Sequence, residues 1–228
     1  MKNIKFCVIG LGYFGYNLAV ELSKAGAEVL AVDNHQNKID EIADKVTLAV
    51  CMDTTDINAL KSLGLEDMDG VIVAIGEGFE GSIMTTAHLQ EIGVKKIYSR
   101  VTSKVHGRLL ELMDIHELLL PEADAAIQMA NKLMNPGLIN SLKISNDYSI
   151  FEIIVPQKFI GKALIDLNLR ENYDMNLVTI KRKTKQSGMF KSKEVETIIG
   201  VPKPNEIFQE GDVLILFGAN KNLKELID

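Results

Sequence analysis

Three glycines, Gly10, Gly12 and Gly15, follow the apolar run 4–9 with the spacing GxGxxG. In nucleotide-binding turns the first glycine permits a tight turn and the second lets the backbone approach a phosphate. The third lets the next helix lie close to the sheet. The free N–H groups and the positive dipole end of that helix then face the anion. The spacing therefore predicts phosphate binding near the start of the chain.

Asp33 ends the next apolar run, residues 28–32, at the distance where a carboxylate meets the ribose hydroxyls of a nucleotide. The alternative for Asp33 is a carboxylate that only ends a strand or caps a helix. The glycines upstream favour the ribose contact. Strand, turn, helix, strand and acid together predict a nucleotide site.

Other polar or small residues also follow expected strands. Asp53 either contacts the adenine side of a nucleotide or, like Thr54, caps the next helix. Gly76 either brings its backbone to the ligand or forms a plain turn. Arg100 either directs a fixed positive charge at a phosphate or forms a surface ion pair. The sequence leaves these alternatives open.

Several other charged residues have simpler interpretations. The four histidines share no metal-ligand spacing, which favours surface or core roles. Glu122 and Asp124 are typical of the first turn of a helix. The basic run 181–185 predicts a solvated hairpin, with an acidic surface or an anionic ligand as the alternative partner.

The candidate residues need a scaffold that brings strand ends together. Residues 1–121 alternate short apolar runs with helical segments, which predicts an α/β fold with a Rossmann-like, doubly wound parallel sheet. Right-handed crossovers would place Gly10, Asp33, Asp53, Gly76 and Arg100 at one sheet edge. We expect strands near 4–9, 28–32, 47–51, 70–75, 96–100 and 116–119, and helices that begin near 14, 36, 55, 81 and 103.

The rest of the chain changes character. Residues 122–142 are expected to form a connector helix and a linker, and residues 143–228 a second, smaller α+β domain. In that domain we expect strands near 148–155, 176–181, 196–201 and 212–217 and a short helix over 161–167. An apolar stripe on the connector predicts a homo-oligomer, with packing on the chain's own domain as the alternative; it comprises Ile127, Ala130, Leu133 and Met134.

Composition excludes several classes of protein. Of the 228 residues, 31 are acidic and 25 basic, and the net charge of −6 argues against nucleic acid as a partner. No apolar run approaches the roughly 20 residues that a membrane helix requires. The first residues lead directly into a strand, so we expect a cytoplasmic protein. Cys7 and Cys51 are expected to be small buried hydrophobes in a reducing compartment.

A dehydrogenase is the main alternative for a GxGxxG turn. It needs an acid or base beside the nicotinamide. Residues 122–228 contain no histidine and no cysteine, and none of their tyrosines and lysines has the YxxxK spacing. We therefore do not expect an enzyme, and an NAD(H)-dependent oxidoreductase or an NAD(H)-responsive redox sensor remains the alternative.

Ordered motifs across the whole chain resemble the RCK family of potassium-transport regulators, in particular the Ktr and Trk peripheral subunits. The matching runs are 10–15, 32–33, 71–76, 120–122, 149–152, 167–170 and 211–214, together with Leu164 and Ile207. The resemblance implies dimers that assemble into an octameric cytosolic ring beneath an integral-membrane potassium channel or transporter. It also implies that ATP, ADP or NAD(H) binds the Rossmann crevice.

The resemblance also implies roles for particular residues. The glycines would hold phosphates, Asp33 the ribose and Asp53 the adenine side. Glu122 matches a family glutamate near the nucleotide at a subunit interface, where some members hold a cation. Many close relatives carry arginine at the position of Tyr13. Tyrosine lacks the permanent positive charge of that arginine. The full expected set is Gly10, Gly12, Tyr13, Phe14, Gly15, Asp33, Asp53, Thr54, Ile75, Gly76, Arg100 and Glu122.

In similar regulators the C-terminal domain binds cyclic di-AMP at a dimer interface. Leu164, Ile165, Arg170 and Asn176 occupy matching positions and would supply apolar walls and polar contacts. The expected mechanism is ligand-biased gating, in which ligands with different affinities for two ring shapes shift the populations of those shapes.

Overall fold

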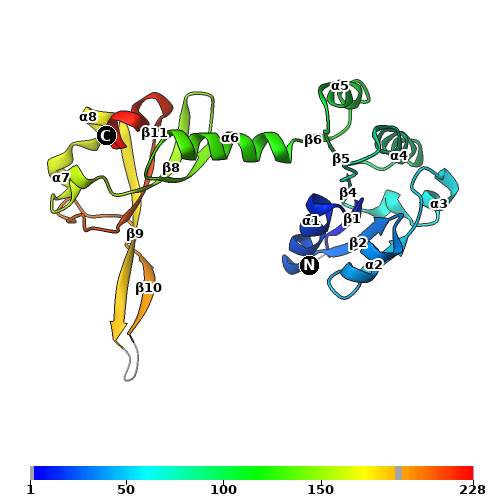
Figure 1. Cartoon of the computed structure of the whole chain (residues 1–228), viewed down its shortest axis with the longest axis horizontal. Helices are drawn as coiled ribbons and strands as arrows, with labels where there is room; N and C mark the ends of the chain where they lie inside the picture. The colour runs from blue at the N-terminus through cyan, green and yellow to red at the C-terminus, as the bar shows by residue number, and fades with distance from the viewer. Residues whose placement is uncertain (1–2, 188–191, 228) are drawn as a thin grey trace. The chain divides into compact units, whose positions relative to one another are not determined.

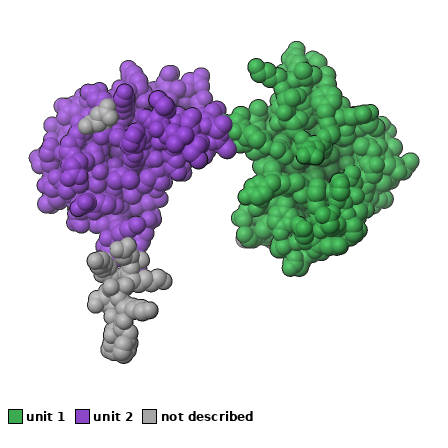
Figure 2. Space-filling view, viewed as in Figure 1, with its two compact units in different colours: residues 1–123 green, residues 124–228 purple. Residues whose placement is uncertain are grey.

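The computed structural model describes residues 3–187 and 192–227 and divides the chain into two compact units. Unit 1 comprises residues 1–123 and unit 2 residues 124–228, shown in green and purple in Figure 2. Each unit has its own sheet and its own apolar core.

Unit 1 is a doubly wound parallel sheet with strand order β3-β2-β1-β4-β5-β6 (Figure 1). This order confirms the predicted Rossmann-like fold, and the order reverses between β1 and β4, where such sheets bind ligands. The strands are β1 (Lys5–Ile9), β2 (Glu28–Asp33), β3 (Leu48–Cys51), β4 (Gly70–Val73), β5 (Ile97–Arg100) and β6 (Glu117–Leu119). The helices are α1 (Tyr13–Lys24), α2 (Gln36–Ile42), α3 (Ile57–Lys61), α4 (Phe79–Ile92) and α5 (Lys104–Leu112), with a 3-10 turn at Leu65–Asp67.

The sheet of unit 1 has an apolar core on each face. Alternate residues of a strand point to opposite faces, so Cys7 and Ile9 belong to one core and Val8 to the other. Cys7 is fully buried, and burial raises the pKa of its thiol. Cys51 is exposed, contrary to the sequence prediction, because it ends β3 at the edge of the sheet. The two-sided packing holds the strand ends in fixed positions.

Unit 2 is built on an antiparallel sheet with strand order β10-β9-β11-β8-β7 (Figure 1). Its strands are β7 (Leu138–Lys143), β8 (Tyr148–Ile154), β9 (Met175–Ser187), β10 (Ser192–Ile198) and β11 (Val213–Ala219). Its helices are α6 (Pro121–Met134, which begins in unit 1), α7 (Leu164–Leu167), α8 (Leu169–Tyr173) and α9 (Leu223–Ile227), with 3-10 turns at Gln157–Phe159 and Asn220–Asn222. A second, smaller α+β domain is thereby confirmed.

Unit 2 differs from the sequence prediction in several segments: the strand expected over 196–201 is β10 at Ser192–Ile198, and the helix expected over 161–167 is reduced to α7 at Leu164–Leu167. Residues 138–142 were expected to be linker but form most of β7, which pairs with β8. The basic run 181–185 lies within β9. Strand β10 pairs antiparallel with β9 from Lys181 to Ser187, which forms the predicted hairpin. Residues 188–191, between the two strands, lie outside the described residues.

The connector helix α6 buries none of its residues, all of which the structure describes. Ile127 is 59% exposed and Leu133 is 75% exposed. The apolar stripe therefore stays exposed on α6, and its coverage by a second subunit stays a prediction. Across residues 3–187 and 192–227, no helix combines the length and apolar character needed to cross a bilayer.

Candidate functional site

The glycine turn between β1 and α1 is constrained at two of its three glycines. Gly10 has a φ of 92°, and its N–H donates to the Val32 carbonyl at 2.7 Å. A Cβ placed on Gly15 would lie 1.9 Å from the Gly10 oxygen, so α1 can approach the turn only with glycine there. At Gly12, by contrast, no described atom apart from those of the adjoining residues lies within 4 Å of an added Cβ. The packing of the chain therefore places no steric constraint on Gly12, which is the N-cap residue of α1.

A cleft of about 870 Å³ opens at the carboxyl ends of the strands in unit 1. Its volume lies within the usual range for small-molecule sites. The expected residues that line it are Gly10, Gly12, Tyr13, Asp33, Asp53, Thr54, Ile75, Gly76 and Arg100. Phe14, Gly15 and Glu122 do not line it. Gly15 packs under the turn, and the Phe14 ring lies 5.9 Å from the guanidinium carbon of Arg100.

Asp33 joins the end of β2 to the glycine turn. Its Oδ2 accepts a hydrogen bond from the backbone N–H of Leu11 at 2.7 Å, and its Oδ1 accepts one from the N–H of His35 at 3.0 Å. The carboxylate is nearly buried, which raises its pKa, but these hydrogen bonds and the Lys38 charge outweigh burial and hold the pKa below its ordinary value. Asp33 is therefore an ionised acceptor at the floor of the cleft.

Two basic side chains at this cleft, His35 and Lys38, were not singled out from the sequence. Lys38 Nζ lies 3.3 Å from Asp33 Oδ2, and His35 Nδ1 lies 3.1 Å from Asp33 Oδ1. Both residues line the cleft, where α2 begins directly after β2. Their place in the sequence could have indicated them. A helix that begins just after a strand starts at the same sheet edge as the acid that ends the strand.

Asp53 and Thr54 occupy the end of β3 without capping α3. The N-cap of α3 is Asp56, whose Oδ1 accepts from the N–H groups of Asn58 and Ala59. Asp53 accepts two hydrogen bonds from Thr55, which lower the pKa of its carboxyl group. Of the two alternatives left open by the sequence, capping of α3 is therefore wrong for both residues, and Asp53 lines the cleft.

The buried hydroxyl of Thr54 contacts the hydroxyl of Thr85 at 2.8 Å. Thr85 lies in α4, so this contact joins the loop after β3 to that helix.

Arg100 at the end of β5 forms an ion pair with Glu122 in the first turn of α6. The hydrogen bond from Arg100 lowers the pKa of Glu122. The guanidinium lies against Gly76, where an added Cβ would be 2.6 Å from Nη1. The Nε atom of Arg100 is buried and has no hydrogen-bond partner among the described residues. Arg100 thus forms an ion pair while it also lines the cleft.

The same arginine borders a second cleft in unit 1, of about 730 Å³. Glu122, Lys104 and Arg108 also line this cleft, which places charges of both signs around it together with Arg100. Among the described residues there is no group of three or more His, Cys, Asp or Glu side chains that could hold a metal ion.

The four residues expected at a second ligand all lie in unit 2. Arg170 in α8 donates a hydrogen bond through Nε to the side-chain oxygen of Asn176 in β9. Leu164 in α7 packs in part against the core, and its neighbour Ile165 is 61% exposed. The structure thus brings Arg170 and Asn176 into direct contact. The apolar side chain of Ile165 on α7 is exposed to solvent.

Family comparisons agree with the two-unit fold. Residues 6–121 match the TrkA-N domain model, and residues 149–228 match the TrkA-C domain model. The chain belongs to the RCK family of potassium-transport regulators. It is 36% identical to Ktr system potassium uptake protein C of Bacillus subtilis over 94% of this chain and 92% of that protein. It is 34% identical to Ktr system potassium uptake protein A of the same organism, over 98% and 96% of the two chains.

Solved structures support the RCK fold. The crystal structure of the GsuK RCK domain matches all of this chain with a TM-score of 0.64 at 15% identity. The structure described as the GsuK channel bound to NAD matches 99% of this chain with a TM-score of 0.60, also at 15% identity. This chain spans 48% and 39% of those two chains. The family resemblance seen in the motifs is therefore confirmed, and so is the fold.

Proposed function

We propose that this chain is a cytoplasmic, nucleotide-binding regulatory subunit of a membrane potassium channel or transporter. Its subunits assemble as dimers into an octameric ring at the inner face of the membrane. The observation that carries the proposal is the space in front of Gly12, which lines the cleft at the carboxyl ends of the strands. The chain that contains this cleft is similar to a Ktr protein over nearly its whole length. Two Ktr relatives at 34–36% identity, matched over nearly their whole length, support the potassium-transport role.

The ligand of the cleft is an adenine nucleotide or dinucleotide, namely ATP, ADP or NAD(H). Its phosphates bind the glycine turn, where α1 presents free N–H groups. Its ribose hydroxyls donate to Asp33, and its adenine side lies near Asp53. The site needs ionised Asp33 as the acceptor, which the low pKa of this carboxyl group supplies.

Regulation requires no covalent chemistry. A nucleotide that binds two ring shapes with different affinities shifts their populations, typically with about 1–3 kcal/mol of coupling per site. Arg100 is well placed to contribute, because it borders the cleft and also binds Glu122 at the start of α6. A phosphate that binds the Arg100 guanidinium competes with Glu122 for its charge, and so alters the first turn of the connector helix. A cation that binds Glu122 would act on the same pair.

Tyr13 lines the cleft at the position that bears on the choice between ATP and ADP. Its side chain is 92% exposed, so it is free to meet a ligand or a neighbouring subunit. Tyrosine lacks the permanent charge that would favour an additional terminal phosphate. We therefore expect weak discrimination between ATP and ADP, and an increase in ATP preference for Tyr13→Arg in the assembled protein.

Cyclic di-AMP is the proposed ligand of unit 2. Leu164 and Ile165 would supply the apolar wall, and the Arg170–Asn176 pair the polar contacts. The support for this part is the resemblance of the runs around 164–170 to the family, together with the exposure of Ile165.

Binding measurements on the full-length protein test both sites. Calorimetric titrations with ATP, ADP, AMP, NAD, NADH and cyclic di-AMP are repeated with Gly12→Ala and Arg170→Ala. We expect Gly12→Ala to remove mononucleotide or dinucleotide binding and to leave cyclic di-AMP binding intact, with the opposite result for Arg170→Ala. A wild-type protein that binds none of these ligands, or that turns over NADH with a carbonyl substrate, would contradict the proposal.

Partner gating is tested separately with the potassium transporter that copurifies with the chain. In proteoliposomes, potassium flux should depend on the nucleotide added, and this dependence should be lost with Gly12→Ala. Light scattering on the purified chain should report an octamer, whereas a monomer at micromolar concentration would contradict the ring.

A further inference from the structure

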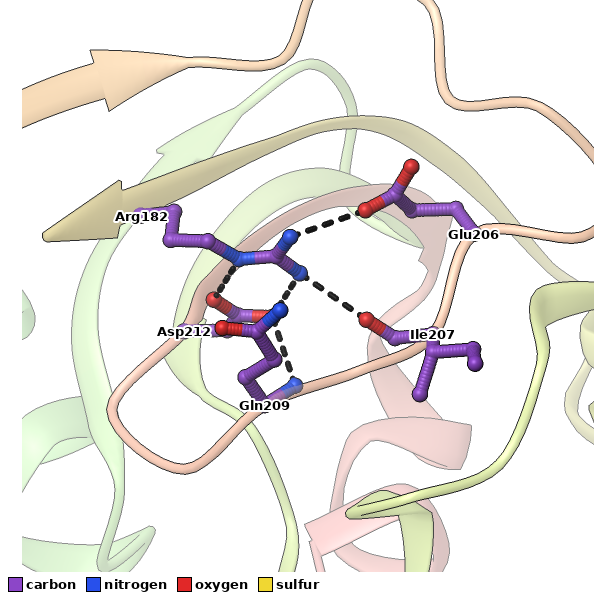
Figure 3. A network of polar contacts seen from close by, with 5 residues as sticks. All are labelled: Arg182, Glu206, Ile207, Gln209 and Asp212. Atoms are coloured by element: carbon purple, nitrogen blue, oxygen red, sulfur yellow. Dashed lines mark hydrogen bonds and ion pairs between the residues drawn. The ribbon is translucent and has the colours of Figure 1, made fainter. Parts of the chain in front are cut away.

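Arg182 in β9 lies at the centre of a charged network in unit 2 (Figure 3). Its Nε and Nη2 atoms donate to the two carboxylate oxygens of Asp212, each at 2.7 Å. Nη1 donates to Glu206 at 2.9 Å, and Nη2 also donates to the carbonyl oxygen of Ile207 at 2.9 Å. Asp212 is fully buried, and the Arg182 side chain is 14% exposed. No residue of this network belongs to the sets expected to bind ligand.

The hydrogen bonds of the network fix the orientation of the Arg182 guanidinium as well as its distance from Asp212. A guanidinium that forms two parallel hydrogen bonds to one carboxylate cannot rotate without breaking one of them. The backbone N–H of Gln209 donates to Asp212 Oδ2 at 2.9 Å, which engages this carboxylate further. Arg182 therefore holds residues 206–209 in a defined place relative to β9 and to the start of β11.

The segment 204–208 in turn holds the backbone that leads into α7. Glu206 and Pro204 accept hydrogen bonds through their carbonyl oxygens from the N–H groups of Leu164 and Ile165, at 2.9 and 2.8 Å. Ala163 forms an antiparallel bridge with Ile207. The placement of Leu164 and Ile165 thus depends on the segment that Arg182 fixes.

The strand that carries Arg182 also carries the polar half of the proposed second site. Asn176 lies six positions earlier on β9 and accepts the hydrogen bond from Arg170. One strand therefore sets the position of the polar pair directly, and the position of the apolar pair through Arg182.

We infer that Arg182 is a positioning residue for the second ligand site, through the Arg182–Glu206/Ile207 contacts that fix the backbone of Leu164 and Ile165. The inference rests on the proposed binding of cyclic di-AMP by unit 2. Arg182 itself does not touch the ligand.

The test compares Arg182→Lys with Lys181→Gln in the full-length protein. Lysine keeps the positive charge of Arg182 but not the two-pronged hydrogen bond. Lys181 is the next residue along β9 and forms an ion pair with Glu152 on β8, at 2.7 Å, that does not involve the 204–208 segment. We expect Arg182→Lys to weaken cyclic di-AMP binding by about tenfold. We expect Lys181→Gln to leave it unchanged and both variants to keep wild-type ADP affinity.

Amide hydrogen exchange separates positioning from loss of stability. At a temperature where Arg182→Lys is folded, the amides of Leu164 and Ile165 should exchange faster than in the wild type, while those of the β8–β11 pairing should not. Glu206→Gln is a milder second variant, because it leaves the Arg182–Asp212 pair intact. It should weaken cyclic di-AMP binding by a few-fold, and it decides the matter if Arg182→Lys does not fold.

Unchanged cyclic di-AMP affinity in folded Arg182→Lys, or in Glu206→Gln where Arg182→Lys does not fold, would overturn the inference and leave the proposed second site standing. A wild-type protein that binds ADP but not cyclic di-AMP would overturn both the second site and the inference, and leave the nucleotide site of unit 1 untouched.

Discussion

Each unit contains a buried aspartate that is held by hydrogen bonds, but the two differ in what surrounds them. Asp33 in unit 1 is 6% exposed and is paired with Lys38 and His35, whose side chains are 35% and 62% exposed. Asp212 in unit 2 is fully buried and is paired with Arg182, which is 14% exposed. Partners that reach solvent can be rearranged by a ligand, whereas a buried guanidinium cannot move without a large penalty. The first aspartate suits a binding site and the second suits a fixed support.

The largest expected effect follows from Asp212→Ala. The substitution leaves Arg182 partly buried without its main partner, which should reduce the free energy of unfolding of unit 2 by about 3–5 kcal/mol. Hydrogen exchange resolved by unit checks this, with the exposed Asp147→Ala as control. Equal loss of protection in unit 1 would break the contrast between the two aspartates.

The next largest effect is expected at Gly15. An alanine Cβ would lie 1.9 Å from the Gly10 oxygen, so α1 must shift away from the turn. We expect Gly15→Ala to lower the free energy of unfolding of unit 1 by about 1–3 kcal/mol. Denaturant unfolding followed by circular dichroism measures it.

Gly12→Ala is the matched comparison in the same turn. No described atom opposes its Cβ, so the free energy of unfolding should change by no more than about 0.5 kcal/mol. Nucleotide affinity should nevertheless fall by at least about tenfold, because the methyl group occupies the approach to the turn. Unchanged affinity would show that no ligand reaches Gly12.

Asp33→Asn should give a smaller, pH-dependent effect. The folded pKa of Asp33 lies below the unfolded value of about 3.9, so its contribution is complete above that pH and is lost as pH falls through the folded pKa. We expect a loss of about 1–2 kcal/mol at pH 7, and a wild-type curve that begins to approach that of the variant below about pH 4 and meets it only below the folded pKa. Unfolding at a series of pH values tests this, and a difference that grows on acidification would contradict it.

The smallest expected effect is that of Lys38→Met. The lysine is partly exposed, and surface charges of this kind contribute about 0.2–1 kcal/mol. Nucleotide affinity should therefore fall by only a few-fold, and the loss should shrink at high salt. A calorimetric titration at two salt concentrations distinguishes this from a specific contact, which salt would affect much less.

The parallel sheet could be predicted closely because its signals are local. Most strands of unit 1 are short apolar runs followed closely by a glycine or a polar residue, and the observed bounds differ from the expected ones by one or two residues. The strand β7 was missed because its burial alternates only weakly and its pairing with β8 is a tertiary fact. The cap of α3 was placed too early because Thr54, a good cap residue, is used instead by Thr85.

The charged partnerships could not be predicted, since their members lie far apart in the sequence. Arg100 and Glu122 are separated by 22 residues, and Arg182 and Asp212 by 30. In the sequence Arg182 is one of several basic residues on a hairpin, and its burial depends on a strand that follows the hairpin. The pairing of strands in the sheet determines which basic side chain of the run becomes buried, and the sequence of the run alone does not.

The exposed connector helix has a consequence for the protein in dilute solution. A helix of 14 residues that buries no side chain gains almost nothing from tertiary packing, and isolated helices of this length are marginal in water. The stability of this helix therefore depends on contacts that another subunit makes with Ile127 and Leu133. Helix content per residue should fall as the protein is diluted, so the connector would make its own folding a measure of subunit concentration.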